Sequence, residues 1–236
     1  MSKKIVPLDK ETHKDLKIRS AVNFPHVAEE QLIPLTVHEV AIAATEFPVV
    51  FVKDSQTGQF HIVVLCGLKP KENLYAQKER WNGNYIPLLI RNYPLSLAAP
   101  GKSSEQFVVC IDQSSSLVSG DQGEPLFDES GAQTDFLKAR SDALVKYATQ
   151  AEVTNAFIKL MIDWELLVAQ EVNIDIASGE DVSLKGFYII NEKRLNELDD
   201  AKFGDLRRRG FLSVIYGQLL SLNQVYRLVN KKEAVA

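Results

Sequence analysis

Two short apolar runs separated by a turn-forming cluster set the first limit on how this chain folds. The runs at residues 47–52 and 60–65 are rich in Val and Phe, and the cluster between them, 54–58, reads Asp-Ser-Gln-Thr-Gly. β-Branched and aromatic residues favour strands, whereas Asp, Ser and Gly favour tight turns. This arrangement predicts a β-hairpin, and therefore an antiparallel sheet in the first half of the chain.

A proline-rich connection follows the hairpin over residues 69–101. Its four prolines are Pro70, Pro87, Pro94 and Pro100. A proline inside a helix removes a backbone hydrogen bond and clashes with the preceding turn. We therefore expect a structured connection of short elements, followed by a buried strand at 107–111.

The second half of the chain carries the apolar spacing of amphipathic helices. Apolar residues share one helical face between 153 and 168 and again between 212 and 229. Thr149 and Glu152 form a potential capping box, so a new helix is predicted to begin there, after a separate helix at 134–148. A second hairpin is predicted from the runs 172–176 and 182–190 around Ser178-Gly179-Glu180-Asp181, with a short helix at 192–198.

Strands that come first, helices that come later and repeated hairpins together predict an α+β fold. We expect an antiparallel sheet with hairpins in the first half and a mainly helical second half packed on it. Residues 1–20 are polar and predict an N-terminal arm that docks late or frays, and residues 21–236 are predicted to form a single domain. The Ser- and Gly-rich segment 114–123 is a candidate sub-domain boundary.

Charge and composition narrow the classes of function. The 236 residues carry a net charge of −4, so no basic excess supports nucleic-acid binding. No apolar region follows the basic N-terminus, so no secretory signal is predicted. The most apolar late stretch, 211–222, is shorter than the roughly 20 residues of a bilayer span. The two cysteines, Cys66 and Cys110, are predicted to be buried thiols, and a soluble cytoplasmic protein is expected.

The sequence contains no motif for a cofactor or a metal. It lacks the glycine patterns of phosphate and dinucleotide loops, the Ser-centred elbow of hydrolases and the paired-histidine zinc helix, so no cofactor is predicted. Its four histidines are His13, His26, His38 and His61. A site built from His26, His38 and a neighbouring Glu29 or Glu39 would have no recognised spacing, so no metal is predicted either.

A single basic run, Arg207–Arg209, admits two interpretations. Clustered arginines can bind a phosphate or a peptide carboxylate. We favour a structural role, because positive side chains stabilise the negative end of a helix dipole and Gly210 is placed to end that helix.

An unusual grouping of aromatic, arginine and proline residues occupies residues 73–94. We select Trp81, Tyr85, Arg91 and Tyr93 as candidate ligand-binding residues, since aromatics near proline can line a groove for an extended peptide. The competing interpretation is a packed core in which Asn and Arg satisfy the polar atoms of Trp and Tyr. For Arg91 a ligand-binding role and a structural role on a neighbouring ring are both open, and we favour the structural one.

A set of short motifs follows in a characteristic order along the chain: Glu39, Phe47-Pro48-Val49-Val50-Phe51, Gly67-Leu68, Glu72-Asn73-Leu74-Tyr75, Trp81, Tyr85-Ile86-Pro87, Ile90-Arg91-Asn92-Tyr93-Pro94-Leu95, Ile111-Asp112, Gly123, Leu126-Phe127-Asp128, Gly186-Phe187, Ile190-Asn191-Glu192, Leu206, Gly210 and Ser221-Leu222. As a set they resemble the bacterial SapC family over nearly the whole chain. Asn92 and Leu95 depart from similar proteins, which often carry Arg and Phe there. The family is named after a surface-layer-associated protein, and the resemblance brings no established catalytic residues.

Three classes of function remain open. The favoured one is a non-catalytic binding or accessory protein that recognises a peptide, a protein partner or a small ligand through residues 81–93. The second is an enzyme with dispersed residues, acting on a peptide or amino-acid derivative, with Asp112, His38 and Glu39 as candidates. The third is a structural component of a surface layer. A pocket with His or carboxylate groups of perturbed pKa would favour the enzyme, and one lined by aromatics and Arg would favour binding.

Overall fold

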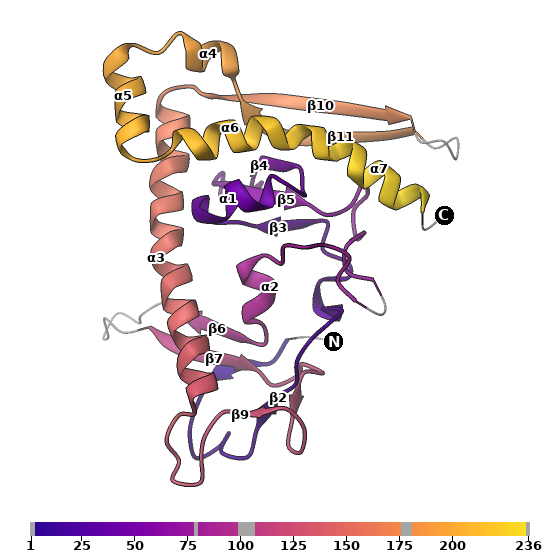
Figure 1. Ribbon diagram of the computed structural model, residues 1–236, viewed down its shortest axis with the longest axis vertical. Helices are drawn as coiled ribbons and strands as arrows, with labels where there is room; N and C mark the ends of the chain where they lie inside the picture. Colours follow the sequence, from indigo (N-terminus) through magenta and orange to yellow (C-terminus); the bar gives the residue numbers. More distant parts are fainter. Residues whose placement is uncertain (1–2, 78–79, 99–106, 176–180, 235–236) are drawn as a thin grey trace.

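The computed structural model describes residues 3–77, 80–98, 107–175 and 181–234 and contains three antiparallel sheets covered by helices (Figure 1). The strands are β1 (Ile5–Pro7), β2 (Lys17–Ile18), β3 (Leu32–Pro34), β4 (Val49–Lys53), β5 (Phe60–Leu65), β6 (Leu95–Ala98), β7 (Val108–Asp112), β8 (Val118–Ser119), β9 (Glu124–Pro125), β10 (Leu167–Asp175) and β11 (Asp181–Ile190). The helices are α1 (Val37–Ala43), α2 (Leu88–Asn92), α3 (Asp135–Asp163), α4 (Glu192–Asn196), α5 (Asp200–Arg208), α6 (Leu212–Ser221) and α7 (Val225–Glu233), with short 3-10 turns η1 (Pro25–Val27) and η2 (Leu222–Gln224). The predicted α+β class is confirmed.

The largest sheet has five strands in the order β10-β11-β4-β5-β3. The predicted first hairpin is confirmed, with Val50 opposite Val63. Its turn forms because Oδ1 of Asp54 accepts the backbone N–H groups of Gln56 and Thr57, and Gly58 supplies a φ of +72°. The second predicted hairpin is confirmed as β10 and β11, although its turn at 176–180 lies outside the described residues.

Helices α1, α3 and α6 enclose the main core against this sheet. Figure 1 shows α6 lying along the β10–β11 hairpin with α1 beneath it. Two buried side chains of α6 hold the sheet directly: Gln218 donates to the carbonyl of Val49 and accepts the N–H of Ile190, and Ser221 accepts the N–H of Val49. The largest fully buried side chains of this core are Phe47, Phe51, Ile62, Leu65, Tyr75, Ile90, Phe157, Met161 and Leu166.

A second, smaller core lies at the other end of the molecule. It joins two three-stranded sheets, β1-β7-β6 and β8-β2-β9. The segment predicted as an N-terminal arm supplies β1 and β2, and its His13 is buried and bonded to Gln113 over 2.7 Å between side-chain nitrogens. The buried residues of this second core are Ile18, Leu95, Ile111, Leu126, Phe127, Leu137 and Leu144.

Helix α3 runs the length of the molecule and contributes to both cores (Figure 1). The predicted break before residue 153 is wrong, because Thr149 lies inside a continuous helix and its hydroxyl bonds back to the carbonyl of Val145. The cap is Thr134, whose hydroxyl accepts the N–H of Leu137. Leu144 packs in the second core and Phe157 in the main core, so tertiary contacts on both sides of Thr149 hold the helix continuous.

The C-terminal helical region differs from its prediction in one respect. The single helix expected over 212–229 is divided into α6 and α7 by the turn η2. The structural interpretation of the arginine run agrees with the fold: α5 ends at these residues, Arg208 and Arg209 pair with Asp205, and Gly210 follows with a φ of +73°.

Candidate functional site

Trp81 belongs to the main core. Its side chain is 6% exposed, and its ring lies 5.6 Å from that of Tyr75 and 6.0 Å from that of Phe24. The indole Nε1–H donates to the carbonyl of Tyr85 at 2.9 Å, so its polar atom is satisfied within the chain. Of the four selected residues, this one packs as the core interpretation described.

Two buried glutamates hold the backbone that follows Trp81. Glu39 lies in α1, where it forms a capping box with Thr36, and it also accepts the N–H of Leu88 at 2.8 Å. Glu46, just beyond α1, accepts the N–H groups of Asn84 and Tyr85 at 2.8 to 2.9 Å. Hydrogen bonds to a carboxylate are among the stronger ones in proteins, so these two acids set the path of residues 84–88.

Tyr85 and Arg91 contact each other beside this backbone. The Tyr85 hydroxyl donates to Glu39 at 2.8 Å, and burial together with that carboxylate raises the pKa of Tyr85. The Arg91 side chain is exposed, with its guanidinium carbon 5.8 Å from the centre of the Tyr85 ring. Its backbone carbonyl accepts from the Arg140 guanidinium. Arg91 therefore stacks on an aromatic ring at the surface.

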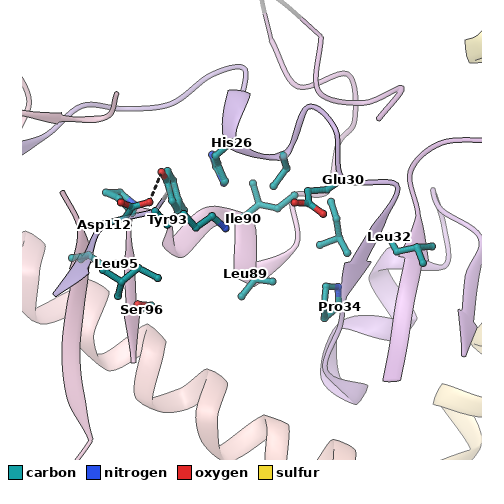
Figure 2. Close-up of a pocket in the computed structure, with 15 residues that line it drawn as sticks. His26, Glu30, Leu32, Pro34, Leu89, Ile90, Tyr93, Leu95, Ser96 and Asp112 are labelled. Atoms are coloured by element: carbon teal, nitrogen blue, oxygen red, sulfur yellow. Dashed lines mark hydrogen bonds between the residues drawn. The ribbon is translucent and has the colours of Figure 1, made fainter. Parts of the chain in front are cut away.

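Tyr93 lies apart from the other three, in the wall of a groove. Its ring stacks on His26 with 3.8 Å between centroids and 17° between planes, and its hydroxyl donates to Oδ2 of Asp112 at 3.1 Å. Figure 2 shows these three side chains together at one end of the groove. They come from η1, the end of α2 and β7, which only the tertiary fold brings together.

This groove, which we name the edge groove, lies between β3 of the large sheet and β6 of the small one, with α2 beside it (Figure 2). Its volume is about 290 Å³. Apolar side chains form most of its wall, and polar groups are few. The lining residues are Lys3, Ile5, His26, Val27, Glu30, Leu32, Ile33, Pro34, Leu89, Ile90, Tyr93, Pro94, Leu95, Ser96 and Asp112.

At the end of the groove formed by His26, Tyr93 and Asp112, the surroundings keep each of these side chains in one protonation state near neutral pH. Desolvation, with a contribution from Lys3, lowers the pKa of His26 to about 4, and neither ring nitrogen has a hydrogen-bond partner among the described residues. Burial pushes the pKa of Asp112 upward, but hydrogen bonds from Ser114 and the N–H of Lys4 outweigh it and leave the pKa lowered. Burial raises the pKa of Tyr93. The site thus combines a neutral imidazole, a phenol and a charged carboxylate.

A second, larger groove of about 560 Å³ lies between the β10–β11 hairpin and the η2–α7 segment. Its wall is mostly apolar, and Tyr226 is the only titratable side chain among the described residues that line it. The edge groove is the better candidate site because its lining contains Tyr93, a residue selected from the sequence, together with charged side chains.

The structure separates most of the candidates selected from the sequence. Of the four ligand-binding candidates, Tyr85 and Arg91 touch, Trp81 is in the core, and Tyr93 lines the edge groove. Among the enzyme candidates, Asp112 lines the groove, Glu39 is engaged in the cap of α1, and His38 is exposed on the same helix.

Sequence reasoning did not single out His26, Glu30 or Leu89 as groove residues. It considered His26 only for a metal site and Leu89 only as part of the candidate segment 81–93, and it did not select Glu30. Within the described part of the chain, no group of three or more His, Cys, Asp or Glu side chains is arranged to hold a metal ion.

Comparison with known proteins connects this geometry to a family. The family model described as SapC matches residues 8–228. The chain belongs to the SapC family. No curated protein and no solved structure matches it significantly. The SapC match includes His26, Tyr93 and Asp112, whereas Lys3 and Ile5 of the groove precede it. Across the described ranges of this SapC chain, no helix is long and apolar enough to cross a bilayer.

Proposed function

We propose that this SapC protein is a non-catalytic binding or accessory protein that receives apolar side chains of a peptide or protein partner in the edge groove. The observation that carries the proposal is the make-up of the groove: apolar walls from β3, α2 and β6, with His26, Tyr93 and Asp112 gathered at one end. Ligand sites generally combine an apolar lining with a small number of placed polar groups.

The size of the groove suits side chains better than a large cofactor. Its volume of about 290 Å³ lies at the lower limit of pockets that take small molecules. Leu89 is 46% exposed at its mouth, so an incoming apolar group gains contact area there without displacing the core.

The protonation states in the groove support binding over catalysis. A general acid or base works best with a pKa near the working pH. The pKa of His26 is about 4, that of Asp112 is lowered and that of Tyr93 is raised, so all three move away from neutrality. The perturbed pKa values that would favour an enzyme are present, but their direction opposes proton transfer.

The alternative function is an enzyme acting on a peptide or amino-acid derivative in the same groove. The observation in its favour is that Asp112, selected as a catalytic candidate, meets Tyr93 and His26 there. A structural role in a surface layer has no comparable support. We further place the protein in the cytoplasm as part of this proposal, because Cys66 and Cys110 are free buried thiols, which suit a reducing compartment.

Methyl NMR of the purified chain tests the proposal. A library of small apolar fragments and capped dipeptides is added while the methyl signals of Leu89, Ile90 and Leu95 are followed. We expect saturable shifts at these methyls that are reduced in Leu89→Gln. Ile42→Gln is the matched control, since Ile42 is 50% exposed on α1 and outside the groove.

Two results would count against this function. If the fragments shift only methyl signals of residues distant from the groove, the edge groove is not the binding site. If the protein converts a capped dipeptide chemically and Asp112→Asn abolishes that turnover, the protein is an enzyme and the non-catalytic role is wrong.

A further inference from the structure

The second groove, which we name the hairpin groove, lies between the β10–β11 hairpin and the η2–α7 segment. Figure 1 shows α7 beside the outer part of this hairpin. Pro48, Val50 and Leu65, which lie in or next to β4 and β5, complete the lining. The volume of about 560 Å³ is within the range of pockets that hold small molecules, roughly 300–1,000 Å³. The two grooves share no lining residue, so they are separate sites.

An irregularity in the hairpin adds an apolar side chain to this groove. The register shifts so that Gln170 lies opposite Phe187 and Val172 lies opposite Leu184, and Gly186 takes a φ of +80° between the two pairs. Leu184 and Phe187 are three residues apart, a spacing that places side chains on opposite faces of a regular strand. Both nevertheless line the groove. The irregularity therefore turns the outer part of the hairpin so that its apolar side chains meet those of the inner part.

Helix α7, the opposite wall, is held in place by polar contacts on its other side. Lys231 donates to the carbonyl of Asn82 at 2.6 Å, and Arg227 pairs with the buried carboxylate of Glu46 at 3.7 Å. Helical spacing places Lys231 and Arg227 on nearly the opposite side of the helix from Val229, which lines the groove. The helix is thus anchored to the main core through one side, while its apolar side forms the groove wall.

The lining is mainly aliphatic, and its polar side chains are amides and a phenol. Ten of its fifteen residues are Val, Leu, Ile or Pro. Val50 and Leu65 are buried, whereas the four polar residues are all exposed and so mark the open side: Gln170, Asn173, Asn223 and Tyr226. Amides and hydroxyls can both donate and accept hydrogen bonds. No charged side chain is present among the described lining residues, so neither an anion nor a cation would gain a partner that offsets lost hydration.

We propose that the hairpin groove binds a small molecule with an aliphatic chain and an uncharged polar head, of the class of medium-chain alcohols and primary amides. The chain lies against Leu65, Leu184 and Val229, and burial of its methylene groups supplies most of the affinity. The head stays at the open side, where the exposed amide and hydroxyl side chains can bond to it. This site is additional to the edge groove and does not depend on the function proposed there.

Titration of the full chain with four small probes tests this assignment. Methyl signals of Val172, Leu184 and Val229 are followed while octanol, hexanol, octanoate or octylammonium is added near neutral pH. We expect saturable shifts with octanol, and binding of hexanol at least about fivefold weaker because two methylene groups are missing. Octanoate and octylammonium should each bind at least about threefold more weakly than octanol, since neither charge has a partner in the groove.

Two variants with matched controls locate the site. Val229→Gln should weaken octanol at least about fivefold, provided that its circular dichroism matches the wild type, whereas Val153→Gln on α3 should leave it unchanged. Tyr226 is 73% exposed, so Tyr226→Lys places a cation at the groove without disturbing the core. It should tighten octanoate by about 1.5- to 5-fold and weaken octylammonium. Tyr216→Lys, on α6 and outside the groove, should change neither.

Each contrary result overturns a stated part of the proposal. If octanol gives no saturable shift at these methyls, or if Tyr226→Lys leaves both ions unaffected, the hairpin groove is not the site. If octanoate or octylammonium binds as tightly as octanol to the wild type, the uncharged head is wrong. The test of the edge groove follows other methyl signals, those of Leu89, Ile90 and Leu95, so failure of one site is distinguishable from failure of the other.

Discussion

The carboxylate of Glu39 and the hydroxyl of Tyr85 lie 2.8 Å apart, although 46 positions separate them in the chain. The same carboxylate accepts from Thr36 and from the N–H of Leu88. One buried acid thus caps α1 and positions the segment that leads into α2. The edge groove depends on this contact because α2 carries Leu89 and Ile90 to its wall.

Replacing Glu39 with Gln should destabilise the protein by about 1–3 kcal/mol. One of the two carboxylate oxygens becomes an NH₂ group, which is itself a donor and cannot accept the hydrogen bonds that this oxygen received. Either Leu88 or Thr36 then has a buried N–H without an acceptor. Urea unfolding measures the change. His38→Gln, one position earlier on the exposed face of α1, should stay within about 0.5 kcal/mol, and equal effects of the two changes would contradict the role of Glu39.

Arg91→Ala should lower stability by less than about 1 kcal/mol, as expected for an exposed cation–π contact. The side chain stacks on Tyr85, and its link to Arg140 runs through the backbone carbonyl, which alanine retains. A thermal melt beside wild type checks this expectation. A loss above about 2 kcal/mol would show that the guanidinium supports a buried partner.

Gly67→Ala should be among the most destabilising small changes in the chain, costing about 1–3 kcal/mol or more. A Cβ at this position would lie 2.2 Å from the backbone oxygen of Glu72, which cannot rotate away as a side chain can. Gly120→Ala is the matched control, since a Cβ there meets no atom within 4 Å. Chemical denaturation of both variants decides the matter, and similar midpoints would refute the predicted clash.

His26 should make stability depend on pH in the mildly acidic range. Its pKa is about 4 in the folded protein and 6.5 as the ordinary value, so the unfolded chain binds more protons between these values. The contribution of His26 is therefore complete above about pH 6.5 and is lost as pH falls through about 4. His26→Phe keeps a flat ring against Tyr93 and removes the titration, so its stability should fall less over this range.

Unfolding free energies of wild type and His26→Phe at about pH 4.5, 5.5 and 7.5 measure this difference. The lowered pKa of Asp112 places its own titration below 3.8, outside the same window. Parallel curves for wild type and His26→Phe would contradict the prediction.

Features governed by nearby residues could be predicted from the sequence. The β4–β5 hairpin follows from strand-forming runs and from Asp54, whose side chain caps the turn over only three residues. The end of α5 at the arginine run likewise needs only Asp205 and Gly210. Such short-range interactions form in almost any tertiary setting, so sequence patterns report them well.

Thr149 illustrates where local signals fail. Its capping potential was real, but a helix start there would have separated Leu144 from Phe157, which anchor α3 in two different cores. Burial of large apolar side chains at both ends outweighs a cap worth about 1 kcal/mol. The hydroxyl bonds back to Val145 instead.

The grouping of aromatic and basic residues in 73–94 is visible in the amino-acid order alone, because composition needs no fold. How these residues divide depends on packing, which sends Trp81 into the core, leaves Arg91 at the surface and places Tyr93 in the edge groove. The partners of Tyr93, His26 and Asp112, lie on η1 and β7. Their meeting depends on how two sheets and α2 pack, and long-range packing leaves no periodic trace in the sequence.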